Sequence, residues 1–323
     1  MPTGFVYSDR FRDHDTGAGH PERPDRLRAV ERGLKERGLW DRLRHLAFAE
    51  ASRDRLTWLH TPAYVERAFE TCAAGRPYLD VPDSAVCDGS ADIAALAVGG
   101  VLRAVEAVMA GEVANAFCAV RPPGHHAEAD RSMGFCLFAN AALAADAAVV
   151  DHGLERVAVV DFDVHHGNGT QHLLEHRADV LFVSVHQHPD GCYPGTGYAD
   201  EAGTGDGAGF TLNVPLAPGG GDAVYAAAFA ERVVPRLDAF KPQLVVVSAG
   251  FDAAAADPLA QMNLSAAGFA AMTEALVGVA QRHAGGRLVS VLEGGYDLDA
   301  LADGVAAHVQ ALVAAGRAAE SAT

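Results

Sequence analysis

The segment VAVVDFDVHHGN, residues 157–168, decides how this sequence folds. It begins as a short, wholly apolar, β-branched run and ends as a cluster of carboxylates, imidazoles and glycine. A strand of that composition is typical of a parallel sheet that helices cover on both faces. The change to polar groups occurs at its carboxyl end, where open α/β sheets bind ligands. The segment therefore predicts a buried strand with a functional site at its end.

Four other apolar runs repeat this pattern, and alanine-rich, helix-like segments separate them. This alternation favours the α/β class with a parallel sheet. The predicted strands are Ala116–Val120, Val157–Val160, Val180–Val185, Leu244–Ser248 and Leu288–Leu292. The predicted helices are Leu27–Arg37, Pro62–Ala73, Ile93–Ala110, Asn140–His152, Ala223–Phe240 and Ser265–His283. No linker or low-complexity stretch divides the chain, so we expect one domain over residues 1–323.

Composition narrows the class of protein. Apolar residues make up 50% of the 323, which provides a large core. The formal net charge of -17 disfavours nucleic acid as a partner, because the phosphate backbone would be repelled. Five cysteines without CxxC spacing fit reduced thiols, so we expect a cytoplasmic protein. Charges or glycines interrupt the apolar stretches, so we expect neither a membrane span nor a membrane partner.

The polar ends of two predicted strands supply a candidate metal site. Asp161, Asp163 and His165 are spaced by two, so an extended backbone would place their side chains on one face. Three such groups at the end of a buried strand are costly unless a cation compensates them. Asp252, at the end of another strand, adds a further carboxylate. Two carboxylates and one imidazole leave an open coordination position, as a catalytic zinc requires.

Three further residues predict acid–base chemistry beside that metal. His125 and His126 follow a Pro-Pro-Gly turn, and adjacent imidazoles can divide the duties of neutral base and charged neighbour. Tyr296 follows two glycines, which allow the backbone to bring its phenol close to a developing oxyanion. Two loop histidines or one Gly-Gly-Tyr tripeptide are weak signals alone, and their position after predicted strands gives them weight.

These residues lie in motifs that resemble the histone deacetylases and their bacterial relatives. The motifs follow the order of that family: RPPGHHA (121–127), MGFC (133–136), DFDVHHGNGTQ (161–171), YPGTG (193–197), NVPL (213–216), AGFDA (249–253) and EGGYD (293–297). Asn168 resembles the class II branch, which includes acetylpolyamine amidohydrolases. The resemblance implies the arginase–deacetylase fold, a three-layer α/β/α arrangement with a central eight-stranded parallel sheet.

The resemblance also implies a role for each residue of the site. The implied zinc ligands are Asp163, His165 and Asp252. Asp161 would orient His125 and keep it protonated, while Asn168 would face His126. We take His126 as the general base that activates water and later as the acid that protonates the leaving amine. Tyr296 would stabilise the tetrahedral oxyanion.

Other positions match residues around the zinc in this family. A structural potassium ion is common there, and the residues implied for it are Asp161 and Ser184. Phe135 and Tyr193 match two aromatics that flank a narrow channel for a slim alkyl chain, and Gly134 would let that chain pass close to the backbone. Arg26 matches a first-loop residue with two open roles, lining an internal product channel or forming a structural ion pair.

The substrate is the least determined part of the prediction. Polyamine specialists carry a glutamate shortly after the AGFD aspartate, and this chain has Leu259 there, which favours an acetylated lysine-like amine in a peptide or small molecule. Asp83 and Ser84 resemble an acidic–polar pair, in which Ser84 would accept a substrate N–H and Asp83 would attract a cationic amine. We therefore expect hydrolysis of an acetyl or acyl amide to free amine and acetate. Hydrolysis of acetylpolyamines or small acetyl amides stays open.

Two other functions compete with this prediction. An arginase-like ureohydrolase with two metals would need extra carboxylates, whereas Asp252 is followed by alanines and the next acid is Asp257. A catalytically silent acetyl-amine binding protein would usually lack a ligand or the tyrosine, and every such position is filled here. The oligomeric state, homo-oligomers included, and the choice between zinc and iron are left open.

Overall fold

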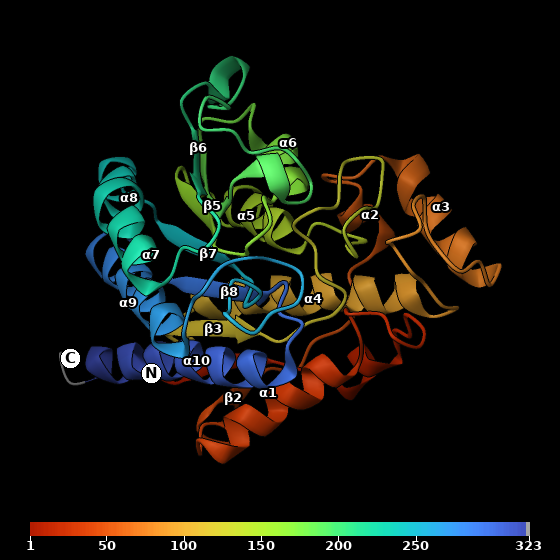
Figure 1. Cartoon of the computed structure of the whole chain (residues 1–323), viewed down its shortest axis with the longest axis horizontal. Helices are drawn as coiled ribbons and strands as arrows, with labels where there is room; N and C mark the ends of the chain where they lie inside the picture. Colours follow the sequence, from red (N-terminus) through yellow and green to blue (C-terminus); the bar gives the residue numbers. More distant parts are fainter. Residues whose placement is uncertain (321–323) are drawn as a thin grey trace.

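Eight strands form a single, all-parallel sheet at the centre of the protein, seen here in a computed structural model that describes residues 1–320 (Figure 1). The strands are β1 (Thr3–Val6), β2 (Arg44–His45), β3 (Asn115–Cys118), β4 (Val157–Asp161), β5 (Val180–Gln187), β6 (Thr211–Leu216), β7 (Leu244–Ala249) and β8 (Leu288–Leu292). Their order across the sheet is β2-β1-β3-β8-β7-β4-β5-β6. Residues 321–323 of the predicted domain lie outside the described residues.

Two helical layers enclose the sheet (Figure 1). One layer contains α4 (Ser90–Met109), α5 (Asn140–Val150) and α6 (Asn168–Leu174). The other contains α1 (Asp25–Glu36), α7 (Asp222–Ala228), α8 (Val234–Phe240), α9 (Ala266–His283) and α10 (Leu298–Glu320). The short α2 (Arg53–Leu56) and α3 (Pro62–Ala73) flank the α4 side of the molecule (Figure 1). The predicted three-layer α/β/α fold with an eight-stranded parallel sheet is confirmed.

The central strands are the ones that their sequence predicts best. Val157 to Val160 are fully buried, as are the valines of β7, because helices cover both faces of the sheet. The sequence patterns missed the edge strands β2 and β6 and also β1, which lies beside β2. These strands are short or interrupted by polar residues and proline. Pro215 in β6 is tolerated because β6 has only one neighbouring strand.

The segment predicted as one helix, Ala223–Phe240, is divided in the structure. A π-helical turn, Phe229–Val233, joins α7 to α8. Pro235 lies in the first turn of α8, where it has no N–H to donate and its ring crowds the carbonyl four residues earlier. The hydrogen-bond ladder therefore changes register just before the proline.

Helix α10 is long and apolar enough to cross a membrane, judged by its length and composition alone. Its segment Leu298–Gly316 has a mean hydropathy of 1.2, which the sequence-based expectation overlooked. In the structure 56% of that segment is buried, because α10 packs against α1, α9 and the sheet. A helix buried in the core of its own protein can have the same length and composition. The packing of α10 therefore explains its apolar face.

Candidate metal centre and active site

Four neighbouring strands, β3, β8, β7 and β4, end at the same edge of the sheet. Because these strands are parallel, the segments that follow them converge there. The candidate residues that these segments carry are His125, His126, Asp163, His165, Asp252 and Tyr296. The structure therefore brings together the polar ends of four of the five predicted strands.

The fifth strand, β5, contributes its histidines elsewhere. His186 lies inside β5, bonds the Ser184 hydroxyl at 2.8 Å and faces the Gly197 carbonyl at 2.8 Å. His188 instead accepts from the backbone N–H of Asp190 in the following turn. Because β5 extends to Gln187, neither histidine joins the residues that converge at the end of the four neighbouring strands.

Asp163, His165 and Asp252 form a buried group of three donors. The Nδ1 atom of His165 lies 3.0 Å from Oδ1 of Asp163 and 3.0 Å from Oδ2 of Asp252. One donor atom from each residue lies within 4.8 Å of the other two. The two carboxylates are fully buried and the imidazole is 7% exposed. This geometry suits a single cation bound by two oxygens and one nitrogen.

Asp161 is not part of this donor group. Strand β4 ends at Asp161, and the chain then bends, so Asp161, Asp163 and His165 do not share one extended face as expected. Oδ1 of Asp161 accepts the backbone N–H of Asp163 at 3.0 Å, and Oδ2 lies 3.0 Å from Nδ1 of His125. Asp161 therefore fixes the backbone of Asp163 and the ring of His125, and it supplies no atom to the donor group.

The charges of the donor group explain why it fits a cation. Burial, and then the charge of Asp163, raise the pKa of Asp252 to about 7. Burial alone would lower the pKa of His165, but the Asp252 carboxylate and then Asp163 outweigh it and hold that pKa well above its usual range. Two carboxylates forced this close in a dry site repel each other, and a divalent cation between them removes that repulsion.

Two glycines provide the room for these carboxylates. A Cβ atom on Gly294 would lie 2.1 Å from Oδ2 of Asp252, and one on Gly250 would lie 2.0 Å from Oδ2 of Asp163. The N–H of Gly294 also donates to Oδ2 of Asp163 at 2.7 Å. The two glycines before Tyr296 are predicted to let a ligand approach the backbone, and in the structure Gly294 also makes space for the donor group.

The adjacent histidines have different environments. Nδ1 of His126 lies 2.7 Å from the Asn168 side-chain oxygen, whereas His125 faces Asp161. Burial, and then the neighbours His125 and His165, lower the pKa of His126 well below its usual value. Burial would also lower the pKa of His125, but the carboxylates of Asp163 and Asp161 raise it to about 10. Environments that separate two pKa values in this way are typical of an acid–base pair.

Tyr296 reaches the site on a turn that sequence reasoning did not explain. Asp257, which is almost fully buried, accepts the backbone N–H groups of Tyr296 at 2.6 Å, Asp297 at 3.2 Å and Leu259 at 3.0 Å. It therefore holds Tyr296 and Leu259 in one loop arrangement. The only signal for it in the sequence is an acid directly before Pro258, which predicts a turn and does not reveal its partners.

A cavity of about 280 Å³ opens onto the donor group. The residues that line it are Asp83, His126, Gly134, Phe135, His165, Tyr193, Leu259 and Tyr296. Tyr193 packs edge-on against His126 with ring centroids 5.0 Å apart, and Phe135 packs edge-on against Tyr296 at 5.8 Å. A Cβ on Gly134 would lie 2.2 Å from the His126 ring, so only glycine fits at that wall.

Ser84 does not line this cavity, which corrects the expectation that it binds substrate. Its side chain is fully buried, and its hydroxyl donates to Oδ1 of Asp83 at 3.3 Å. Oδ2 of Asp83 accepts the N–H of Gly134 at 3.3 Å. The hydrogen bond from the buried Ser84 hydroxyl therefore helps to position the Asp83 carboxylate at the rim of the cavity. Of these two residues, only Asp83 lines the cavity.

A second group of possible donors lies beside the first. One donor atom each from His125, Cys136 and Glu293 lies within 4.8 Å of the other two. The Glu293 carboxylate is already engaged, because it accepts N–H groups from Gly124 at 2.7 Å and His125 at 3.1 Å. It also accepts a hydrogen bond from the Ser248 hydroxyl at 3.2 Å. These hydrogen bonds explain the burial of Glu293 without a second metal ion.

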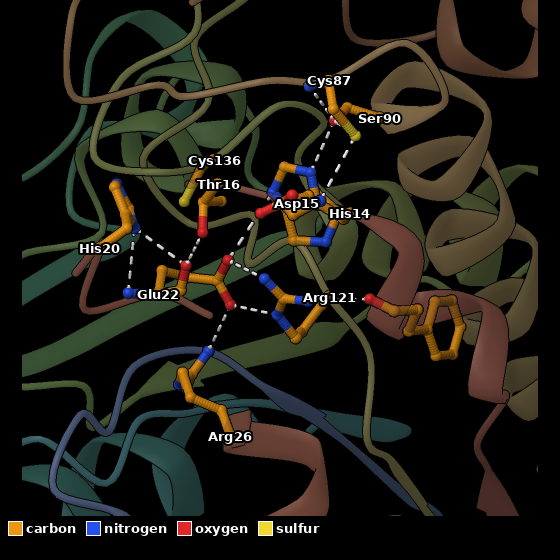
Figure 2. Close-up of polar contacts among 12 residues, drawn as sticks. His14, Asp15, Thr16, His20, Glu22, Arg26, Cys87, Ser90, Arg121 and Cys136 are labelled. Atoms are coloured by element: carbon orange, nitrogen blue, oxygen red, sulfur yellow. Dashed lines mark hydrogen bonds and ion pairs between the residues drawn. The ribbon is translucent and has the colours of Figure 1, made fainter. Parts of the chain in front are cut away.

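Arg26 belongs to a buried ion-pair network, shown in Figure 2. Its guanidinium donates to Glu22 at 3.0 Å, to the Gly295 carbonyl at 2.7 Å and to the Glu293 carbonyl at 2.5 Å. Glu22 also accepts from Arg121 at 2.5 and 2.7 Å. Arg26 lies 5.1 Å from the Tyr296 ring centre without lining the cavity. Of its two open roles, these contacts favour the structural ion pair.

We expect a Glu22→Ala variant to lose about 3–5 kcal/mol of unfolding free energy, since it leaves Arg26 and Arg121 buried without their partner. Chemical denaturation of the wild type and the variant measures this difference. The control is Asp299→Ala, which breaks an exposed ion pair with Arg32 and should cost less than about 1 kcal/mol. A Glu22→Ala protein as stable as the control would contradict this account of the network.

Comparisons with known proteins agree with this geometry. A family model described as the histone deacetylase domain matches residues 20–312. A histone deacetylase-like amidohydrolase of Pseudomonas aeruginosa is 49% identical over 280 residues, which cover 86% of this chain and 73% of that protein. The human polyamine deacetylase HDAC10 is 42% identical over 307 residues, which cover 90% of this chain and 44% of that protein.

A solved structure is also similar to nearly the whole chain. The crystal structure of the HDA15 HD domain aligns with a TM-score of 0.92 and 39% identity, and the match covers 97% of this chain and 90% of that one. The family match includes all the residues that converge at the sheet edge, from His125 to Tyr296. The resemblance predicted from the motifs is confirmed, and the chain belongs to the histone deacetylase family of amidohydrolase enzymes.

Proposed function

We propose that this chain is a zinc-dependent deacetylase that hydrolyses the acetyl or acyl amide of a lysine-like amine. The observation that carries the proposal is the buried group of Asp163, His165 and Asp252 at the base of a cavity that Tyr296 and His126 also line. Metal ligands, a base and an oxyanion donor are the parts that metal-assisted amide hydrolysis needs.

Zinc fits the donor set of this site. Two carboxylate oxygens and one imidazole nitrogen are ligands that zinc accepts, and the cavity leaves a further position open. When bound, zinc would polarise an amide carbonyl and lower the pKa of water at that position. We also propose a structural potassium ion held by Asp161 and Ser184, which are direct partners in the register of β4 and β5.

The two histidines would handle protons. His126 faces the cavity with a lowered pKa, so it is neutral at physiological pH and suited to accept a proton from water and return it to the leaving amine. His125, whose pKa is raised, stays charged beside Asp161 and stabilises negative charge. Tyr296 keeps its proton, because burial and then Asp252 raise its pKa, and so it can donate to the oxyanion.

The cavity favours a slender substrate. Phe135 and Tyr193 form aromatic walls that suit an extended alkyl chain ending in an amide. Leu259 places an apolar side chain on the rim, and Asp83 places one carboxylate there. This supports an acetyl-lysine-like amine, in a peptide or a small molecule. Acetylpolyamines are the second candidate, since Asp83 would attract their cationic amines and the human relative is named a polyamine deacetylase.

The rim gives a direct test of the substrate class. We expect wild-type kcat/KM to be higher for acetyl-lysine peptides than for acetylpolyamines, and Leu259→Glu to raise the ratio of polyamine to peptide activity about 5-fold. A carboxylate facing a cationic amine at a partly exposed rim is worth roughly 1 kcal/mol. Steady-state kinetics on acetyl-lysine peptides, acetylpolyamines and small acetyl amides measures the ratio.

The matched control for that test is Leu259→Gln, because glutamine has nearly the same size as glutamate and carries no charge. We expect it to leave the ratio within about 1.5-fold of the wild type, because the charge is the source of the effect. A wild-type enzyme with a strong preference for polyamines would contradict the assignment of substrate class. Equal ratios for the glutamate and glutamine variants would contradict the role of residue 259.

We also propose that residues 1–323 fold as one catalytic domain in the cytoplasm. The order of the sheet supports one domain, since β8 from the end of the chain pairs with β3 beside β1. The compartment is proposed from the five cysteines, which are free in the structure, because reduced thiols are typical of cytoplasmic proteins.

A further inference from the structure

Asn168 has polar partners on both sides of its amide. Its side-chain oxygen lies 2.7 Å from Nδ1 of His126, the base in the proposed function. Its side-chain NH₂ group donates to Oε1 of Glu128 at 2.5 Å and to the sulfur of Met133 at 3.3 Å. His126 is thus linked through one amide to a carboxylate outside the cavity.

Glu128 decides which way this amide points. An ionised carboxylate only accepts hydrogen bonds, so the amide must present its NH₂ group to Glu128 and its oxygen to His126. The thioether of Met133 is a weak acceptor and favours the same orientation. An oxygen facing Nδ1 of His126 requires a proton on that nitrogen, which leaves the lone pair on Nε2. The outer carboxylate therefore fixes the tautomer that makes His126 a base toward the cavity.

Glu128 is itself held in place by a histidine. Nδ1 of His172 lies 2.9 Å from Oε1 and 3.0 Å from Oε2 of Glu128. Asn168 and His172 are four residues apart on α6, so they face the same side of that helix. The Glu128 side chain is 14% exposed, against 45% for His172, so the carboxylate is sheltered while its outer partner meets solvent.

The neighbouring charges agree with this arrangement. The hydrogen bond to Glu128 raises the pKa of His172, and the carboxylates of Glu128, Glu175 and Glu201 act in the same direction. The backbone of Glu128 is also fixed, because its carbonyl contacts Nδ1 of His60 at 2.8 Å and its N–H donates to Arg131 at 2.9 Å. The carboxylate therefore has one settled position beside Asn168.

We propose that Glu128 is a positioning residue for the proposed hydrolysis: it fixes the Asn168 amide, and thereby holds the proton of His126 on Nδ1. This deepens the proposed function and rests on it for its kinetic consequences. The structural consequence, one dominant tautomer of His126, holds whatever the substrate is.

The first test reads the tautomer directly. In the metal-loaded enzyme with ¹⁵N-labelled histidine, we expect NMR to show His126 protonated on Nδ1. In Glu128→Ala the amide is free to rotate, and we expect the form protonated on Nε2 to rise to roughly one-third or more. Glu128→Gln should keep the wild-type tautomer, because its side-chain oxygen still accepts from Asn168.

The second test reads turnover on the best acetyl amide found for the wild type. We expect Glu128→Ala to lower kcat about 10-fold with KM changed less than about 2-fold, below the roughly 10²–10⁴-fold that a general base contributes. Two effects add here. Fewer molecules hold the correct tautomer, and the positive charge that forms on His126 is no longer stabilised by the nearby Glu128 carboxylate. The Glu128→Gln variant should instead keep kcat within about 3-fold of the wild type.

Asp130→Ala is the matched control. Asp130 is an exposed acid of the same loop, so its loss removes the same charge without touching Asn168. We expect both the tautomer and kcat to stay at wild-type values. Metal content and thermal unfolding of each variant show whether it is folded.

A double variant separates positioning from a general structural role. Asn168→Asp would place a second carboxylate against Glu128, at the position of a 2.5 Å contact. We expect Asn168→Asp to lose activity and the added Glu128→Gln to recover at least about 5-fold, although Glu128→Gln alone is slightly harmful. A recovery of this kind requires direct contact between the two side chains.

The proposal is overturned if Glu128→Ala keeps His126 protonated on Nδ1 and keeps kcat, or if Glu128→Gln and Asn168→Asp act additively. If the wild type turns over no acetyl amide, the proposed function fails, and the NMR measurement still decides whether Glu128 sets the tautomer.

Discussion

Asp252→Asn is expected to lose the metal and at least about 10³-fold in kcat/KM. The substitution removes one of two carboxylate ligands, and a lost contribution of several kcal/mol from a metal corresponds to about three powers of ten in rate. Asparagine still offers an oxygen to the N–H of Val164, which Asp252 accepts at 2.9 Å, so we expect the loop to keep its fold. Metal analysis and steady-state kinetics on the same preparation measure both effects.

The control for this variant is Asp299→Asn, which changes an exposed acid on α10 far from the site. It should keep both the metal and the activity. An Asp252→Asn protein that retains a full complement of metal and wild-type turnover would remove Asp252 from the centre.

Tyr296→Phe is expected to keep the metal and lose about 10²- to 10³-fold in kcat, the usual loss for one oxyanion donor. Phenylalanine retains the ring that packs edge-on against Phe135 and lies near the Arg26 guanidinium, so we expect stability to change little. The loss should appear in kcat rather than KM, since the hydroxyl acts on charge that develops in the transition state.

Tyr198→Phe is the matched control for the tyrosine. Its hydroxyl donates to Asp190 at 2.7 Å on the exposed loop, and its loss should leave kcat within about 2-fold of the wild type. A Tyr296→Phe enzyme with near wild-type kcat would show that the phenol is not the oxyanion donor.

The buried strands and the convergence of Asp163, His165 and Asp252 are the parts that the sequence predicts well. Strands covered on both faces leave uninterrupted apolar runs, and the charged residues directly after β4 and β7 have few roles other than binding a cation. The edge strand β6 was missed because an edge tolerates Asn213 and Pro215, which obscure its pattern.

The supporting contacts were not predictable, because they join segments far apart in the chain. Asp257 reaches the backbone of Tyr296 across 39 residues, and Asn168 reaches Glu128 across 40. Neither acid belongs to a spacing pattern. Ser84 was misplaced for the related reason that a loop residue looks exposed in a sequence until the fold shows what covers it.

Removal and return of zinc tests the central claim most directly. The purified chain would be assayed on acetyl-lysine peptides with its metals measured, then stripped with a chelator and reloaded with zinc. We predict one zinc ion per chain, loss of activity in the stripped protein, and recovery of activity in proportion to the zinc added, up to one equivalent. Two manganese ions per chain, or a fully zinc-loaded protein that hydrolyses no acetyl amide, would contradict the assignment.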